Sequence, residues 1–142
     1  MSAIQASGGL GFDIPPELDA VVRRVRAFVE QDVLPIEASL ADLTDMECVA
    51  SAAHRLRDRA RELNIYIPHL PPEYGGLGLG VLPMALISQE CGRSSLAPLA
   101  INAMAPDEGN MHLLLEVGTE EQKARWLRPL AEGRIRSCFA MT

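Results

Sequence analysis

The chain has 142 residues, 48% hydrophobic and 23% charged, close to the balance of an ordinary globular domain. This length allows one domain with a real core, and the net charge of −6 argues against nucleic acid or an anionic membrane as a partner. The three cysteines, Cys48, Cys91 and Cys138, are far apart and odd in number, which indicates reduced thiols rather than a disulfide framework. No run is long and apolar enough to span a membrane and the start does not read as a secretion signal, so we expect a cytoplasmic protein.

The start of the chain predicts a short lead followed by an amphipathic helix. Residues 1–14 are rich in glycine and serine, so we expect a flexible lead. Pro15 and Pro16 suit the first turn of a helix, and Pro35 is expected to end or bend it. The apolar residues between them recur every three or four positions, as on one face of a helix. They are Leu18, Val21, Val22, Val25, Phe28, Val29 and Val33.

A second helix and a long loop are expected next. Thr44 and Glu47 have the spacing of a capping box, which predicts a helix from about residue 45 to residue 63, with Asn64 as its stop. Residues 65–80 contain three prolines and four glycines and cannot form a regular helix. We expect a loop that needs positive φ angles and close packing.

Four more helices are expected in the second half of the chain, over residues 81–91, 95–103, 111–118 and 120–132. Ser95 is a good N-cap, and Thr119 with Gln122 has the spacing of another capping box. The helix that ends at Gly118 is expected to be short and buried. Residues 135–142 are rich in strand formers and predict one β-strand.

The predicted fold is therefore all-α, an orthogonal bundle of five to six helices followed by the start of one strand. A lone strand cannot satisfy its backbone hydrogen bonds. It must pair with another chain, remain unpaired, or belong to a sheet that the given sequence does not contain.

The sequence matches none of the common nucleotide-binding or metal-site motifs. The run "GGLGLG" has Val81 where a dinucleotide fingerprint needs its third glycine, and no G-K-[ST] follows, so the Rossmann and P-loop interpretations both fail. His54, His69 and His112 are too widely spread to predict a metal site. Asp107 and its acidic neighbour favour a capping or solvated role. Composition and spacing alone reach only a mainly helical domain.

Four segments, in this order, resemble the amino-terminal part of FAD-dependent acyl-CoA dehydrogenases. They are "RAFVEQDVLP", "IPHLPPEYGGLGLG", "ISQECGRSS" and "GTEEQKARWLRPLAEGRIRSCFAMT", and the resemblance covers roughly residues 16–142. It implies that residues 15–134 are the family's amino-terminal helical domain. Residues 135–142 would be the first strand of a truncated β-domain, and the carboxy-terminal domain would be lacking.

The resemblance implies a flavoprotein that α,β-dehydrogenates acyl-CoA thioesters, as in fatty-acid oxidation. In this family FAD accepts a hydride while a glutamate base removes a proton. Glu90 and Glu116 do not match the position of that base, so no catalytic residue is assigned here and the 142-residue chain alone is expected to be inactive. The resemblance also implies an electron-transfer partner and a homo-oligomer.

The resemblance assigns some binding residues to this chain. Phe139 would pack near the flavin, and Met141 and Thr142 would bond the pyrimidine edge of its ring. Residues 100–104, including Ala100 and Met104, would line the acyl-chain tunnel together with Met111, although core packing accounts for them equally well. A second interpretation of the whole chain is a catalytically inactive helical interaction module derived from the same domain.

Overall fold

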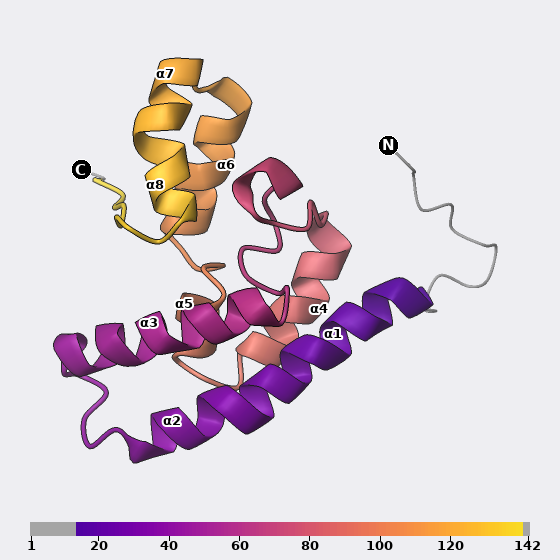
Figure 1. The fold of residues 1–142 in the computed structure, drawn as a ribbon, viewed down its shortest axis with the longest axis vertical. Helices are drawn as coiled ribbons and strands as arrows, with labels where there is room; N and C mark the ends of the chain where they lie inside the picture. Colours follow the sequence, from indigo (N-terminus) through magenta and orange to yellow (C-terminus); the bar gives the residue numbers. More distant parts are fainter. Residues whose placement is uncertain (1–13, 141–142) are drawn as a thin grey trace.

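The computed structural model describes residues 14–140 and consists of helices and loops, with no β-strand among those residues (Figure 1). Nearly all of the predicted lead, residues 1–13, lies outside this range, as do Met141 and Thr142. No helix in the described part of the chain is long and apolar enough to cross a membrane. The helices are α1 (Pro16–Phe28), α2 (Leu34–Ser39), α3 (Met46–Glu62), α4 (Val81–Cys91), α5 (Ala97–Ala100), α6 (Asp107–Val117), α7 (Glu120–Gln122) and α8 (Arg128–Ala131).

The helices cross one another as predicted for an orthogonal bundle. In Figure 1, α1 and α2 form one long rod, whereas α6 and the α7–α8 segment stand side by side and steeply across α3. α4 packs on α1, and α5 packs on α3. One apolar cluster joins these elements, and its fully buried members include Phe28, Leu56, Ile87, Met111 and Leu127.

Pro35 was expected to end or bend the first helix, and the structure shows that it does not end it. A π-helical turn, Val29–Val33, follows α1 directly, and α2 continues the rod with Pro35 in its first turn. A second π-helical turn, Lys123–Leu127, precedes α8 and Pro129 in the same way. Proline lacks an N–H and its ring clashes with the carbonyl four residues earlier, so a wider turn accommodates it inside a helix.

The residues whose side chains bond the first backbone N–H groups of α3 and α5 lie one position away from the predicted ones. Asp45, rather than Thr44, caps α3 by accepting hydrogen bonds from the backbone N–H groups of Glu47 and Cys48. Ser94, rather than Ser95, accepts the bonds at the start of α5. The Thr119–Gln122 capping box and the stop at Asn64, whose φ is 52°, are confirmed.

The glycine-rich loop is held by close backbone packing, as expected. Gly75 and Gly78 have positive φ angles of 86° and 64°. Gly76 has no room for a side chain, because a Cβ there would lie 2.5 Å from the Ile67 carbonyl oxygen and still closer to that of Leu70. A 3-10 turn, Pro72–Tyr74, lies within the same loop.

Expectations for α5 and α6 were wrong. The helix expected over residues 95–103 forms only over Ala97–Ala100. α6 begins at Asp107, earlier than predicted, and it is not buried throughout, because Leu113 and Val117 are 60% and 74% exposed. The expected strand is not formed within the described residues, where 136–140 have no regular secondary structure. A strand needs a neighbouring strand to bond its backbone, and the described part of the chain offers none.

Candidate functional site

The segment after α8 is held by a buried carboxylate at the start of α6. Asp107 is 2% exposed, and its carboxylate accepts hydrogen bonds from Arg136 Nε, from the backbone N–H of Ser137 (2.8 Å) and from the Ser137 hydroxyl (2.7 Å). Asn110, one turn further along α6, donates to the same hydroxyl at 2.8 Å. We call this set of contacts the Asp107 clamp. The interpretation of Asp107 as a capping or solvated acid was therefore wrong.

Phe139, the one described member of the predicted flavin-binding residues, lies beside α6. Its side chain is 56% exposed, and its Cζ lies 3.5 Å from where a Cβ on Gly109 would stand, so the ring packs over that glycine. Met141 and Thr142 lie outside the described residues. The flavin role of all three residues stays a prediction.

The predicted acyl-chain residues do not share one environment. Ala100 and Met111 have no exposed surface and belong to the core cluster, whereas Met104 is 37% exposed. The first two are core residues in this structure, in line with the packing explanation. Their role in lining an acyl-chain tunnel stays a prediction.

Glu90 forms ion pairs and has no free carboxylate to act as a base. It is 7% exposed and accepts a hydrogen bond of 2.7 Å from Arg26 of α1, and Arg93 lies 3.5 Å away on its other side. The hydrogen bond from Arg26 lowers the pKa of Glu90, in spite of its burial. The carboxylate therefore ties α4 to α1 in its ionised form.

Two histidines contact each other between the glycine-rich loop and α6. The rings of His69 and His112 are 5.1 Å apart, and His69 is 4% exposed, with no hydrogen-bond partner for either nitrogen among residues 14–140. Burial, together with the nearby His112, lowers the pKa of His69 to about 4. Its ring is therefore neutral at neutral pH. No group of three metal-ligating side chains occurs among the described residues.

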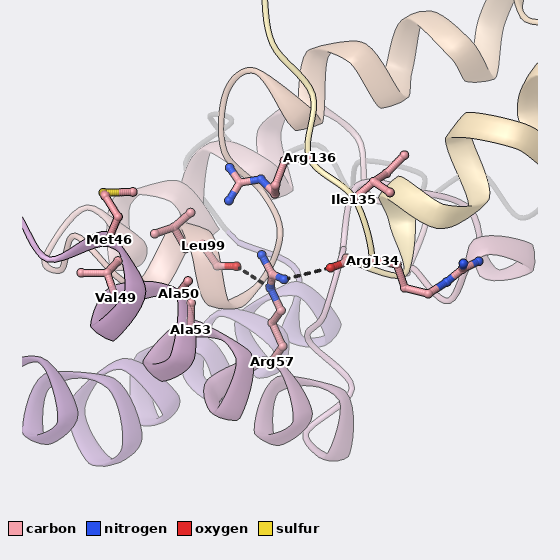
Figure 2. Close-up of a pocket in the computed structure, with 10 residues that line it drawn as sticks. Met46, Val49, Ala50, Ala53, Arg57, Leu99, Arg134, Ile135 and Arg136 are labelled. Atoms are coloured by element: carbon pink, nitrogen blue, oxygen red, sulfur yellow. Dashed lines mark hydrogen bonds between the residues drawn. The ribbon is translucent and has the colours of Figure 1, made fainter.

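A pocket of about 230 Å³ lies between α3 and residues 133–136 (Figure 2). We call it the α3 pocket. Its lining residues come from α3, from α5 and from the segment after α8: Met46, Val49, Ala50, Ala53, Arg57, Leu99, Gly133, Arg134, Ile135 and Arg136.

Arg57 is the buried charge of this pocket. It is 9% exposed, and it donates from Nε to the Leu99 carbonyl at 3.3 Å and from Nη1 to the Gly133 carbonyl at 3.2 Å. Burial lowers the pKa of Arg57, although the group stays charged at neutral pH. Gly133 has a φ of 75°, and a Cβ there would lie 2.8 Å from the Tyr66 hydroxyl, so only glycine suits this approach.

Sequence reasoning found neither Arg57 nor the Asp107 clamp. Both depend on contacts across long sequence separations, from Arg57 to Gly133 and from Asp107 to Ser137. The available signal for Arg57 was its place on the apolar face of α3, seven residues after Ala50 and four after Ala53. A charged residue at such a position indicates a buried, bonded group.

Comparison with known proteins gives the family. The family model described as "Acyl-CoA dehydrogenase, N-terminal domain" matches residues 15–134. The mouse protein "Acyl-CoA dehydrogenase family member 10" is 39% identical over 97% of this chain, and the chicken protein "Acyl-CoA dehydrogenase family member 11" is 37% identical over 86%. The chain spans only 14% and 16% of the lengths of these two relatives.

A solved structure agrees with the sequence comparisons. A Mycobacterium abscessus protein, solved as a candidate acyl-CoA dehydrogenase, superposes with a TM-score of 0.77 and 33% identity over 88% of this chain and 34% of its own. The chain belongs to the acyl-CoA dehydrogenase family, and residues 15–134 are its amino-terminal helical domain. The resemblance seen in the four sequence segments is confirmed.

Proposed function

We propose that this chain forms one wall of the flavin and acyl-chain pocket in an FAD-dependent acyl-CoA dehydrogenase. The family match over residues 15–134 carries the proposal. The Asp107 clamp supports it, because the clamp fixes Arg136 and Ser137 immediately before the residues that the resemblance assigns to the flavin. A site works best when the segment that presents it is held by buried bonds.

The end of the chain has groups that suit the polar edge of a flavin. Within the described residues, the backbone groups of Cys138, Phe139 and Ala140 make no hydrogen bond, so they are available to a ligand. When bound, FAD supplies the hydride acceptor for the Cβ–H bond of an acyl-CoA. The protein's part at this edge is to donate hydrogen bonds where negative charge develops on reduction, and Thr142 would provide one from its hydroxyl.

The catalytic base would come from outside this chain. Glu90 is occupied by two arginines, and Glu116 lies on the exposed part of α6. The apolar side chains of Leu113 and Val117 on α6 would be covered by the remainder of the enzyme. An electron-transfer partner and a homo-oligomer belong to the same proposal.

The test uses the full product of the native gene that encodes this chain. Anaerobic mixing with acyl-CoA thioesters of increasing chain length should bleach the oxidised flavin, whereas the 142-residue chain alone should give no bleaching. Thr142→Ala should weaken FAD retention, because a hydrogen bond to a charged group contributes about 1.5–3 kcal/mol. A native product that binds no flavin, or that leaves every thioester unchanged, would overturn the proposal.

A further inference from the structure

The α3 pocket has an apolar floor formed by one face of a helix. Met46, Val49, Ala50 and Ala53 recur every three or four residues along α3, so they lie on one side of it, and Leu99 of α5 adds to the same surface. Ala50 and Met46 are exposed rather than packed into the core. The floor is therefore open to an apolar group of a ligand.

The other end of the pocket is cationic. In Figure 2 the guanidinium groups of Arg57 and Arg136 lie close together, away from Met46 and Val49 in this view. Arg136 is paired with Asp107, but no carboxylate in the described part of the chain comes within salt-bridge distance of Arg57.

Arg57 retains hydrogen-bonding capacity that the described residues do not use. A guanidinium has five N–H groups, and Arg57 bonds two carbonyls through Nε and Nη1, which leaves Nη2 without a partner among the described residues. Asp107 attracts Arg57 only from beyond salt-bridge distance, so no carboxylate among the described residues bonds this charge directly. A carboxylate fits the planar fork of a guanidinium, so an anion of this kind would offset the buried charge.

We propose that the α3 pocket binds a small aliphatic carboxylate, with the carboxylate on Arg57 and the aliphatic chain on the apolar face of α3. Its volume of about 230 Å³ equals that of roughly seven or eight liquid waters at about 30 Å³ each. This volume suits a chain of about four to six carbons. An inorganic anion would use the arginines but leave the apolar floor open.

This site differs from the one proposed for the flavin and the acyl chain, although Arg136 both lines the α3 pocket and belongs to the Asp107 clamp. Phe139, Ala100, Met104 and Met111 do not line the α3 pocket. The inference therefore does not depend on the proposed function, and either can fail while the other holds.

The test titrates the 142-residue chain with acetate, butyrate, hexanoate and octanoate, with 1-hexanol and inorganic phosphate as controls. Amide NMR shifts, together with the Arg57 Nε–H signal, give the location and the dissociation constant. We expect shifts at Arg57, Ala50 and Gly133. Affinity should rise about fourfold per methylene from acetate to hexanoate, and octanoate should gain no more. Hexanol and phosphate should bind at least tenfold more weakly than hexanoate.

Three variants assign the binding to this pocket. Ala50→Leu adds a larger side chain to the pocket floor at an exposed position, so it should weaken hexanoate binding at least tenfold without altering the fold. Arg57→Gln should weaken it by a similar factor. Arg55→Gln removes the same charge from an exposed position of α3 outside the pocket and should change the affinity less than twofold.

Several results would overturn the inference. They are shifts confined to another face, equal affinity for acetate and hexanoate, hexanol that binds as tightly as hexanoate, or an Ala50→Leu chain that binds hexanoate as the unmodified chain does. The Ala50→Leu variant keeps the test decisive even where Arg57→Gln prevents folding.

Discussion

Replacing Asp107 by asparagine is expected to release the segment after α8. The variant keeps the size of the side chain and one acceptor oxygen for Ser137, but it removes the charge that Arg136 contacts. Its new amide N–H groups also face a guanidinium that can only donate. The residue is 2% exposed, so water cannot replace the lost bond on the Asp107 side, whereas Arg136 is about half exposed and can be hydrated.

The expected cost follows from this one charge-assisted bond. A hydrogen bond to a charged group contributes about 1.5–3 kcal/mol. For a chain of this size, 1 kcal/mol corresponds to about 3–4 °C in Tm, so Asp107→Asn should lower Tm by roughly 5–10 °C. Amide hydrogen exchange at Ser137 should become faster, because its backbone N–H donates to this carboxylate.

Glu108→Gln is the matched control for this prediction. Glu108 is also an acid in the first turn of α6, so it contributes a similar interaction with the helix dipole, but it has no side-chain bond to residues 136–137 among the described residues. The control should lower Tm by at most about 4 °C, as expected for at most about 1 kcal/mol of helix-dipole energy at a surface. Equal Tm values for the two variants, or unchanged exchange at Ser137 in Asp107→Asn, would refute the role of the clamp.

Three further predictions concern packing, pH and association. Gly76→Ala should destabilise the chain by about 3 kcal/mol or more in urea unfolding, because a Cβ there meets two backbone carbonyls. In the control Gly80→Ala, the added Cβ has no described atom within 4 Å, so the cost should be about 1 kcal/mol or less. Similar costs for the two variants would contradict the packing argument. His69 has a pKa of about 4 in the folded chain, against 6.5 for the free side chain, so the unfolded chain binds more protons between these pH values. The free energy of unfolding should therefore fall as the pH drops from 6.5 towards 4, by at most about 1.4 kcal/mol per pH unit. Glu90 has a lowered pKa, so its contribution should be present above its ordinary value of 4.5 and be lost as the pH falls further. His69→Phe should remove the loss of stability between pH 6.5 and 4, whereas His54→Gln, at an exposed position, should leave it unchanged. The same pH dependence in His69→Phe as in the unmodified chain would contradict the burial of His69 as a neutral ring. Finally, the exposed apolar side chains of Leu113, Val117 and Phe139 should make the 142-residue chain self-associate in sedimentation over a hundredfold concentration range, and truncation after Arg134 should weaken this; a chain that stays monomeric would contradict it.

Local signals in the sequence predicted most of the helices. The periodicity from Leu18 to Val33 lies within the continuous rod of α1 and the π-helical turn after it, and the Thr119–Gln122 capping box lies at the start of α7. Neither signal depends on distant contacts. The same holds for Asn64, which takes a positive φ at the end of α3. Features of this kind are encoded by neighbours in the chain.

The misses arose where a local rule had two solutions. Thr44 and Asp45 are both good N-cap residues, and the choice fell on Asp45 while Thr44 bonds Asp42 instead. Proline is disfavoured inside a helix, but the π-helical turn before Pro35 shows that one helical turn can widen so that the helix continues.

The candidate site was harder to predict than the fold. Asp107 and Arg57 look like ordinary surface charges in the sequence, and their burial follows only from the packing of residues 133–137 against α6 and α3. The family resemblance pointed to Phe139 but not to the clamp that precedes it. Contacts between distant segments therefore determine this part of the molecule.

The central claim is that this chain is part of an FAD-dependent acyl-CoA dehydrogenase. The intact mass and the absorption spectrum of the native gene product test it most directly. The account predicts a product heavier than the 142-residue chain, with bound FAD that is released on denaturation. A product with the mass of this chain alone and no flavin absorbance would contradict the claim, and it would favour a helical module without catalysis.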